Sequence, residues 1–148
     1  MVSSTSSTTI LFLLPFKFNR FKKAEIVGND IYTTALLTHA DLFLCPSIYE
    51  PLGIVNLEAM GCETAVLASK VGGIPEVVAH NETGRLVDYD ANNISKFESD
   101  FTAQIEDLMS NTELLTKMGK AGRVRAEKFF GWDAVAKQTT ELYASLLK

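Results

Sequence analysis

The sequence has few of the features that mark secreted, membrane or nucleic-acid-binding proteins. It contains only two cysteines in 148 residues. Both Cys45 and Cys62 have apolar neighbours, which favours small core residues over a disulfide. The net charge is −4, and no basic stripe is present to neutralise phosphates, which argues against a general nucleic-acid partner. No apolar run is long enough to span a bilayer. These absences favour a cytoplasmic protein in a reducing compartment, with no membrane partner.

Residues 1–24 form an N-terminal segment whose composition differs from that of the rest of the chain. Within it, Met1–Thr9 is rich in serine and threonine without an apolar period, and we expect it to be disordered. The apolar stretch 10–14 predicts a short buried strand. A secretory signal is disfavoured because the positive charges follow this stretch instead of preceding it. The composition, 47% hydrophobic and 22% charged, is globular, and we expect one domain over residues 25–148.

Strand and helix patterns alternate along this domain. Continuous apolar runs such as 64–69 are typical of parallel strands covered on both faces. The alternation predicts an α/β fold with a mostly parallel sheet. The expected elements are a helix at 30–40, a strand at 41–45, a helix at about 52–61, a strand at 64–69, a short helix from Pro75, a strand at 85–89, and helical regions at about 93–109, 114–126 and 132–147. A break of the second helical region near Gly119 or Gly122 is left open.

The stretch 44–61 has the composition of a strand, a tight turn and a helix. Pro51 and Gly53 stand where the helix would begin, and proline is favoured in a first helical turn. A helix N-terminus offers free N–H groups and the positive end of the macrodipole, which suits a phosphate. Gly53 leaves no side chain to block a ligand. We therefore expect the N–H groups of Ile54 and Val55 to meet a diphosphate.

Two carboxylates bracket this helix N-terminus, Glu50 before it and Glu58 on the helix. Carboxylates accept hydrogen bonds from paired hydroxyls, as the acidic residue of dinucleotide-binding folds does for a ribose. Taken singly, Glu50 fits an ordinary capping acid and Glu58 a solvated helix residue. Combined with Pro51 and Gly53, they favour a nucleotide sugar, with its diphosphate at the helix tip and one acid toward each sugar.

A second glycine-containing loop follows the strand at 64–69. The adjacent Gly72 and Gly73 allow a tight turn and close approach of a ligand, although a plain loop would also contain them. Ligands of parallel sheets bind at the carboxyl ends of the strands. The turns at 46–53 and 69–74 are therefore expected to converge on one crevice.

Other conspicuous residues are expected to be structural or solvated. His39 lies at a helix end and His80 in a loop, and neither has the spacing of a metal ligand. No Asp-x-Asp-like carboxylate cluster is present, so no metal is expected. Lys70 is expected to be solvated. A basic cluster interleaved with Glu127 predicts a solvated face, with an anionic partner as the minority alternative; its members are Lys117, Lys120, Arg123, Arg125 and Lys128.

The segment from Glu50 to Glu58 resembles the E-x7-E motif of retaining glycosyltransferases with the GT-B fold. Its continuation, GGIPEVV at 72–78 and ETGRLV at 82–87, is similar to family 4 of these enzymes, and most closely to the actinobacterial type of glycogen synthase. The resemblance covers about residues 32–148. Each motif follows at the distance that the family pattern requires, which makes the likeness specific.

The resemblance implies a partial, Rossmann-like C-terminal half of a GT-B enzyme. Its last helix, at about 132–147, would cross back onto the other domain. The implied activity is retaining transfer of glucose from a nucleoside diphosphate sugar, ADP-glucose, to an α-glucan, without a cofactor. The resemblance implies that Glu50 is the catalytic candidate and binds sugar hydroxyls, with help from the N–H groups of Leu52 and Gly53. It implies that Ile54 and Val55 bind the diphosphate and that Glu58 binds the ribose. Gly72 and Gly73 would lie at the floor of the cleft.

The family pattern also implies parts that the matched region does not contain. The acceptor-binding N-terminal domain, and the Arg/Lys pair that holds the leaving diphosphate, would lie upstream of it. We therefore expect the chain alone to bind a nucleotide sugar weakly and to turn over little of it. The open alternatives are transfer to a sugar phosphate or to a lipid-linked acceptor, and a non-catalytic nucleotide-sugar-binding fragment.

Overall fold

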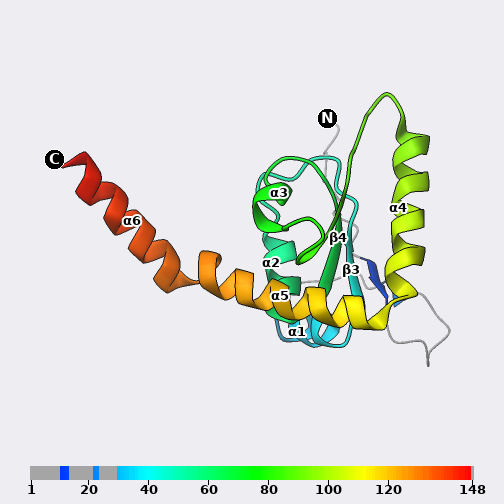
Figure 1. Cartoon of the computed structure of the whole chain (residues 1–148), viewed down its shortest axis with the longest axis horizontal. Coiled ribbons are helices and arrows are strands. Elements are labelled where there is room, and N and C mark those ends of the chain that lie inside the picture. Colours follow the sequence, from blue (N-terminus) through cyan, green and yellow to red (C-terminus); the bar gives the residue numbers. More distant parts are fainter. Residues whose placement is uncertain (1–10, 14–21, 24–29, 148) are drawn as a thin grey trace, which may run out of the picture.

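The computed structural model of the chain describes residues 11–13, 22–23 and 30–147. The disorder expected for Met1–Thr9 falls outside the described residues. Within them, the chain forms a five-stranded sheet with helices on both faces (Figure 1).

The sheet has the strand order β2-β1-β3-β4-β5. Its strands are β1 (Leu11–Leu13), β2 (Lys22–Lys23), β3 (Leu42–Cys45), β4 (Ala65–Ser69) and β5 (Gly84–Val87). β3, β4 and β5 are parallel, with Leu42 opposite Ala65 and Val66 opposite Gly84. β1 is antiparallel to both β2 and β3. The expected α/β fold is confirmed, and the strand expected at 10–14 is present as β1.

Six helices complete the described structure. They are α1 (Asp30–Thr38), α2 (Ile54–Gly61), α3 (Ile74–Val77), α4 (Ile94–Met109), α5 (Thr112–Phe130) and α6 (Trp132–Leu146). Asparagine side chains cap two of them, because Asn93 accepts a hydrogen bond from the N–H of Lys96 and Asn111 accepts one from Leu114. Such caps satisfy N–H groups that a helix start leaves free.

The two faces of β3 and β4 pack into separate hydrophobic clusters. Phe43 and Val66 point into a cluster with α1, α2 and α3, whereas Leu44 and Leu67 point into a cluster with α4 and the start of α5. Every residue of β3 and β4 is buried. This double coverage explains why both strands are continuous apolar runs instead of alternating ones.

Helix α5 crosses the sheet near the amino end of β4 and is unbroken. A Cβ on Gly119 would be 1.9 Å from the carbonyl oxygen of Glu63, and one on Gly122 would be 3.1 Å from the Met60 side chain. The two glycines therefore allow close packing. The helix break that the sequence left open near Gly119 or Gly122 is absent from α5. Two predicted surface cations also have structural partners: Arg123 donates to the Gly61 carbonyl and Arg125 to the Val77 carbonyl.

Helix α6 projects away from the rest of the molecule (Figure 1) and contains no buried residue. Its apolar side chains face solvent, and Trp132 is 88% exposed. This exposure agrees with the expectation for a helix that packs on another domain, although the packing itself stays a prediction. Among the described helices, none has both the length and the apolar character needed to cross a membrane.

Candidate functional site

The turn between β3 and α2 is shaped by one glycine. Gly53 has φ +90° and ψ 46°, in the left-handed region that favours glycine, and it is the N-cap of α2. The helix consequently begins at Ile54 and not at about residue 52, as the sequence suggested. A residue in this conformation cannot continue a right-handed helix, so the chain turns sharply at Gly53.

The N-terminal tip of α2 is open to solvent. Ile54 is 61% exposed and Leu52 is 38% exposed. The first intrahelical bond runs from the N–H of Asn56 to the Gly53 carbonyl at 2.9 Å. The N–H groups of Ile54 and Val55 donate to no group in the described part of the chain. The tip therefore presents two free donors at the positive end of the helix dipole.

The two acids lie on either side of this tip along the chain. Glu50 is half-buried, and its Oε1 accepts a hydrogen bond from the N–H of Gly53 at 3.2 Å. Glu58 is exposed on α2, about 6 Å farther along the helix axis than Ile54. The Gly53 N–H, which was expected to help bind the sugar, is thus occupied by Glu50 in this structure.

The glycine loop after β4 packs directly on the turn that carries Glu50. The N–H of Gly73 donates to the Glu50 carbonyl at 3.1 Å. A Cβ on Gly72 would be 1.9 Å from the same oxygen, and one on Gly73 would be 2.4 Å from the Pro51 carbonyl oxygen. The two loops therefore meet at the carboxyl edge of the sheet. The ligand contacts assigned to these residues stay predictions.

Buried polar contacts hold this edge together. Ser69, at the end of β4, is fully buried, and its hydroxyl donates to the carbonyls of Cys45 and Ser47 at the end of β3. The Lys70 ammonium, expected to be solvated, pairs with Asp88 at 3.1 Å. Both side chains are largely exposed, so this pair contributes little stability.

One residue of the site was missed by the sequence analysis. Asn56, on the first turn of α2, is fully buried, and neither its Nδ2 nor its Oδ1 makes a hydrogen bond in the described structure. An unsatisfied buried amide costs about 1–3 kcal/mol. Asn56 stands out only because it is a buried polar residue. Burial cannot be read from a single Asn within an E-x7-E stretch.

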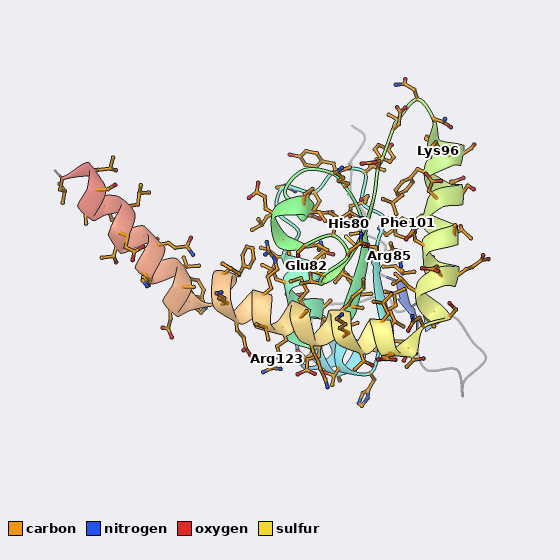
Figure 2. All side chains as sticks on the ribbon, viewed as in Figure 1. His80, Glu82, Arg85, Lys96, Phe101 and Arg123 are labelled. Atoms are coloured by element: carbon orange, nitrogen blue, oxygen red, sulfur yellow. The ribbon has the colours of Figure 1, made fainter. Side chains whose placement is uncertain are left out.

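A groove of about 630 Å³ lies elsewhere, between α4 and β5. Figure 2 shows His80 and Arg85 beside β5 and Lys96 on α4. The charged groups here are largely paired within the protein: Lys96 with Asp100, and Arg85 with Asp107. No residue of the α2 tip lines this groove, so it is not part of the predicted site.

Neither region offers an evident metal site. The described residues contain no group of three or more His, Cys, Asp and Glu side chains placed to hold a metal ion. His80, expected to be an exposed loop residue, is exposed, and its Nδ1 accepts a hydrogen bond from the N–H of Leu86 at 3.0 Å. That bond satisfies a backbone donor of the edge strand β5.

The chain matches a known protein family over most of its length. The profile described as Glycosyl transferases group 1 matches residues 23–125, which is more than half of the chain and includes both loops of the site. The chain belongs to the group 1 glycosyl transferases. Alpha-maltose-1-phosphate synthase of Mycolicibacterium smegmatis is 51% identical to it over 108 residues, which are 73% of this chain and 28% of that protein.

Solved glycosyltransferases share the fold of this group 1 glycosyl transferase. Sucrose-phosphate synthase from Thermosynechococcus elongatus superposes with a TM-score of 0.65 at 35% identity, over 84% of this chain and 30% of that one. The Anabaena protein HepE, in complex with UDP and glucose, gives a TM-score of 0.66 at 26% identity, over 84% and 32%. The chain thus spans about a third or less of each of these three proteins. The finer assignment to glycogen synthase stays a prediction, because the relative named above is a maltose-1-phosphate synthase.

Proposed function

We propose that this group 1 glycosyl transferase chain supplies the donor side of a retaining hexosyltransferase. The observation that carries the proposal is the pair of free N–H groups, on Ile54 and Val55, at an exposed helix tip between Glu50 and Glu58. A diphosphate fits the N–H groups, and hydroxyls fit the acids. The family membership supplies the reaction class.

The donor is a nucleoside diphosphate glucose in this proposal. HepE, a structural neighbour, is described in complex with UDP-glucose and with UDP and glucose. Glu58 would accept hydrogen bonds from the ribose hydroxyls, and Glu50 from the hydroxyls of the transferred glucose. ADP-glucose is the donor expected from the family resemblance. The contacts proposed here involve only the diphosphate and the hydroxyls, so the binding experiment below decides between ADP and UDP donors.

The acceptor that we favour is a sugar phosphate. The Mycolicibacterium relative is named for maltose 1-phosphate, a disaccharide phosphate that glucosyl transfer to a glucose phosphate would form. An α-glucan is the second candidate, through the resemblance to glycogen synthase. In either case we expect, from the resemblance to GT-B enzymes, that the acceptor contacts come from an N-terminal domain outside the matched region.

Each part of the site has a defined task in such a transfer. Negative charge grows on the diphosphate as the glycosidic bond breaks. Preorganised N–H donors at the tip of α2 stabilise that charge, which is often the largest single effect in catalysis. Glu50 orients the glucose, and Gly72 and Gly73 leave room beside it. The chain alone should turn over little donor, because the acceptor and the upstream cations are not part of this site.

Titration calorimetry with ADP, ADP-glucose and UDP-glucose tests the proposal. Glu58→Ala should weaken ADP and ADP-glucose alike by about tenfold or more, as expected for a lost charge-assisted hydrogen bond. Glu82→Ala is the matched control, since Glu82 is an exposed acid outside the turn, and its affinities should equal those of the wild type. Equal, negligible binding by the wild type and Glu58→Ala would show an inert fragment instead.

A further inference from the structure

Asn56 is placed to act on the turn that holds Glu50. It is the third residue of α2, fully buried, with both polar atoms of its amide unpartnered in the described structure. Its amide lies against the N-cap glycine, because a Cβ on Gly53 would be 2.6 Å from Asn56 Nδ2. An apolar residue would fill this position without leaving unpaired polar atoms, so stability alone does not account for an asparagine.

The neighbouring thiol does not provide an adequate partner. Burial raises the pKa of the Cys45 thiol, while interactions with Ser47 and with the Asn56 side chain oppose that rise. A thiol is a weak donor and a weak acceptor. The Asn56 side chain is close enough to Cys45 to affect the pKa of the thiol, but no contact between them meets the geometry of a hydrogen bond.

The side chains of Glu50 and Asn56 both lie beside Gly53. Glu50 Oε1 accepts that hydrogen bond at 3.2 Å. In a capping box, by contrast, the side chain at the third helical position bonds back to the N–H of the N-cap residue. Asn56 holds that third position and Gly53 is the N-cap. Asn56 Nδ2, a donor, is the amide atom that now faces Gly53, so the amide becomes a second acceptor for the Gly53 N–H when it rotates to present its oxygen.

We propose that Asn56 is a positioning residue that takes over the Gly53 N–H when Glu50 turns toward the donor sugar. This inference rests on the proposed function and deepens it. In the free chain, the carboxylate of Glu50 is folded back on its own turn. When Glu50 binds glucose hydroxyls, the Asn56 amide rotates, and its oxygen then accepts the hydrogen bond from the Gly53 N–H. The turn keeps its left-handed shape, and no backbone donor is left unpaired during the exchange.

The inference predicts that sugar binding and stability change in opposite directions. In Asn56→Leu the unpaired amide is gone, so the midpoint of urea unfolding should rise. The affinity for ADP-glucose should nevertheless fall about tenfold, the effect of one lost hydrogen bond, while the affinity for ADP stays within about twofold. Asn56→Ala should likewise weaken the binding of ADP-glucose but not that of ADP, and this variant does not depend on whether a leucine side chain fits. Met60→Leu, a buried apolar change on the same helix, should leave the ratio of the two affinities unchanged.

Glu50→Gln supplies a second, independent readout. It should weaken ADP-glucose binding in the wild type and have a smaller additional effect in Asn56→Leu, because the two side chains act on one hydrogen bond. Equal losses for ADP and ADP-glucose in both Asn56 variants would mean a merely structural role and would overturn the inference. Unchanged ADP-glucose affinity in those variants would do the same. A wild type that binds neither ligand would overturn the proposed function itself, and this inference with it.

Discussion

Gly72 lies so close to Glu50 that a Cβ on Gly72 would be 1.9 Å from the Glu50 carbonyl oxygen. Gly72 also has φ +51°, a backbone conformation that residues other than glycine rarely adopt. The contact joins the two loops at the carboxyl edge of the sheet. The position of Glu50 is consequently fixed by a residue that lies beyond the whole of α2 and β4 in the sequence.

We expect Gly72→Ala to destabilise the fold by about 2 kcal/mol or more, since left-handed strain and a backbone clash add together. Urea unfolding measures this change. Gly61→Ala is the matched control, because nothing lies within 4 Å of the added Cβ and alanine stabilises a helix by about 0.5 kcal/mol or more relative to glycine. The same sign for both variants would contradict the packing described here.

Arg125 connects α5 to the short helix that follows the glycine loop. Its Nε donates to the Val77 carbonyl and its Nη2 to the Glu76 carbonyl, both at 2.8 Å. Arg125→Ala should cost about 1.5–3 kcal/mol, the range for hydrogen bonds to a charged group. Arg125→Lys should recover only part of this, because an ammonium cannot match the planar fork. Lys128→Ala, an exposed cation on the same helix, should change stability by less than about 0.5 kcal/mol.

Helix α6 should contribute little to the stability of the rest of the chain. It contains no buried residue, so removal of residues 132–148 should change the free energy of unfolding by less than about 1 kcal/mol. Leu108→Ala, in the fully buried part of α4, should instead cost about 2–5 kcal/mol. Circular dichroism during urea unfolding compares the two. A truncated chain that loses cooperative unfolding would show that α6 supports the domain.

Burial raises the pKa of the Asp41 carboxyl above its ordinary value. The folded chain therefore holds this proton more tightly than the unfolded chain does. The resulting stabilisation is complete below the unfolded-state pKa and is lost as the pH rises through the folded-state pKa. Asp41→Asn should be more stable than the wild type at about pH 7, with a smaller difference at about pH 3. A difference that does not depend on pH would contradict this assignment.

The sequence predicted the elements whose signals are local. The buried strands at 42–45 and 65–69 were expected from continuous apolar runs, and the turn before α2 from Pro51 and Gly53. The predicted start of α2 was early by two residues, because the left-handed backbone of Gly53 overrides the helix preference of Leu52.

What the sequence could not show depends on contacts between distant segments. Gly119 looked like a helix breaker, but its close approach to Glu63 is visible only in three dimensions. Arg125 looked like part of a solvated face, yet it bonds the end of α3, which lies 48 residues earlier in the chain. Asn56 gave no signal at all, since nothing local indicates that a polar residue on an exposed-looking helix tip is buried.

The most direct test of the account is a titration of the ¹⁵N-labelled chain with ADP, followed by the backbone amide signals in NMR spectra. The account predicts the largest chemical-shift changes at the N–H groups of Ile54 and Val55, with smaller changes at Gly72 and Gly73. Changes confined to the groove between α4 and β5, or none in the turn before α2, would contradict the claim that the open tip of α2 binds the diphosphate.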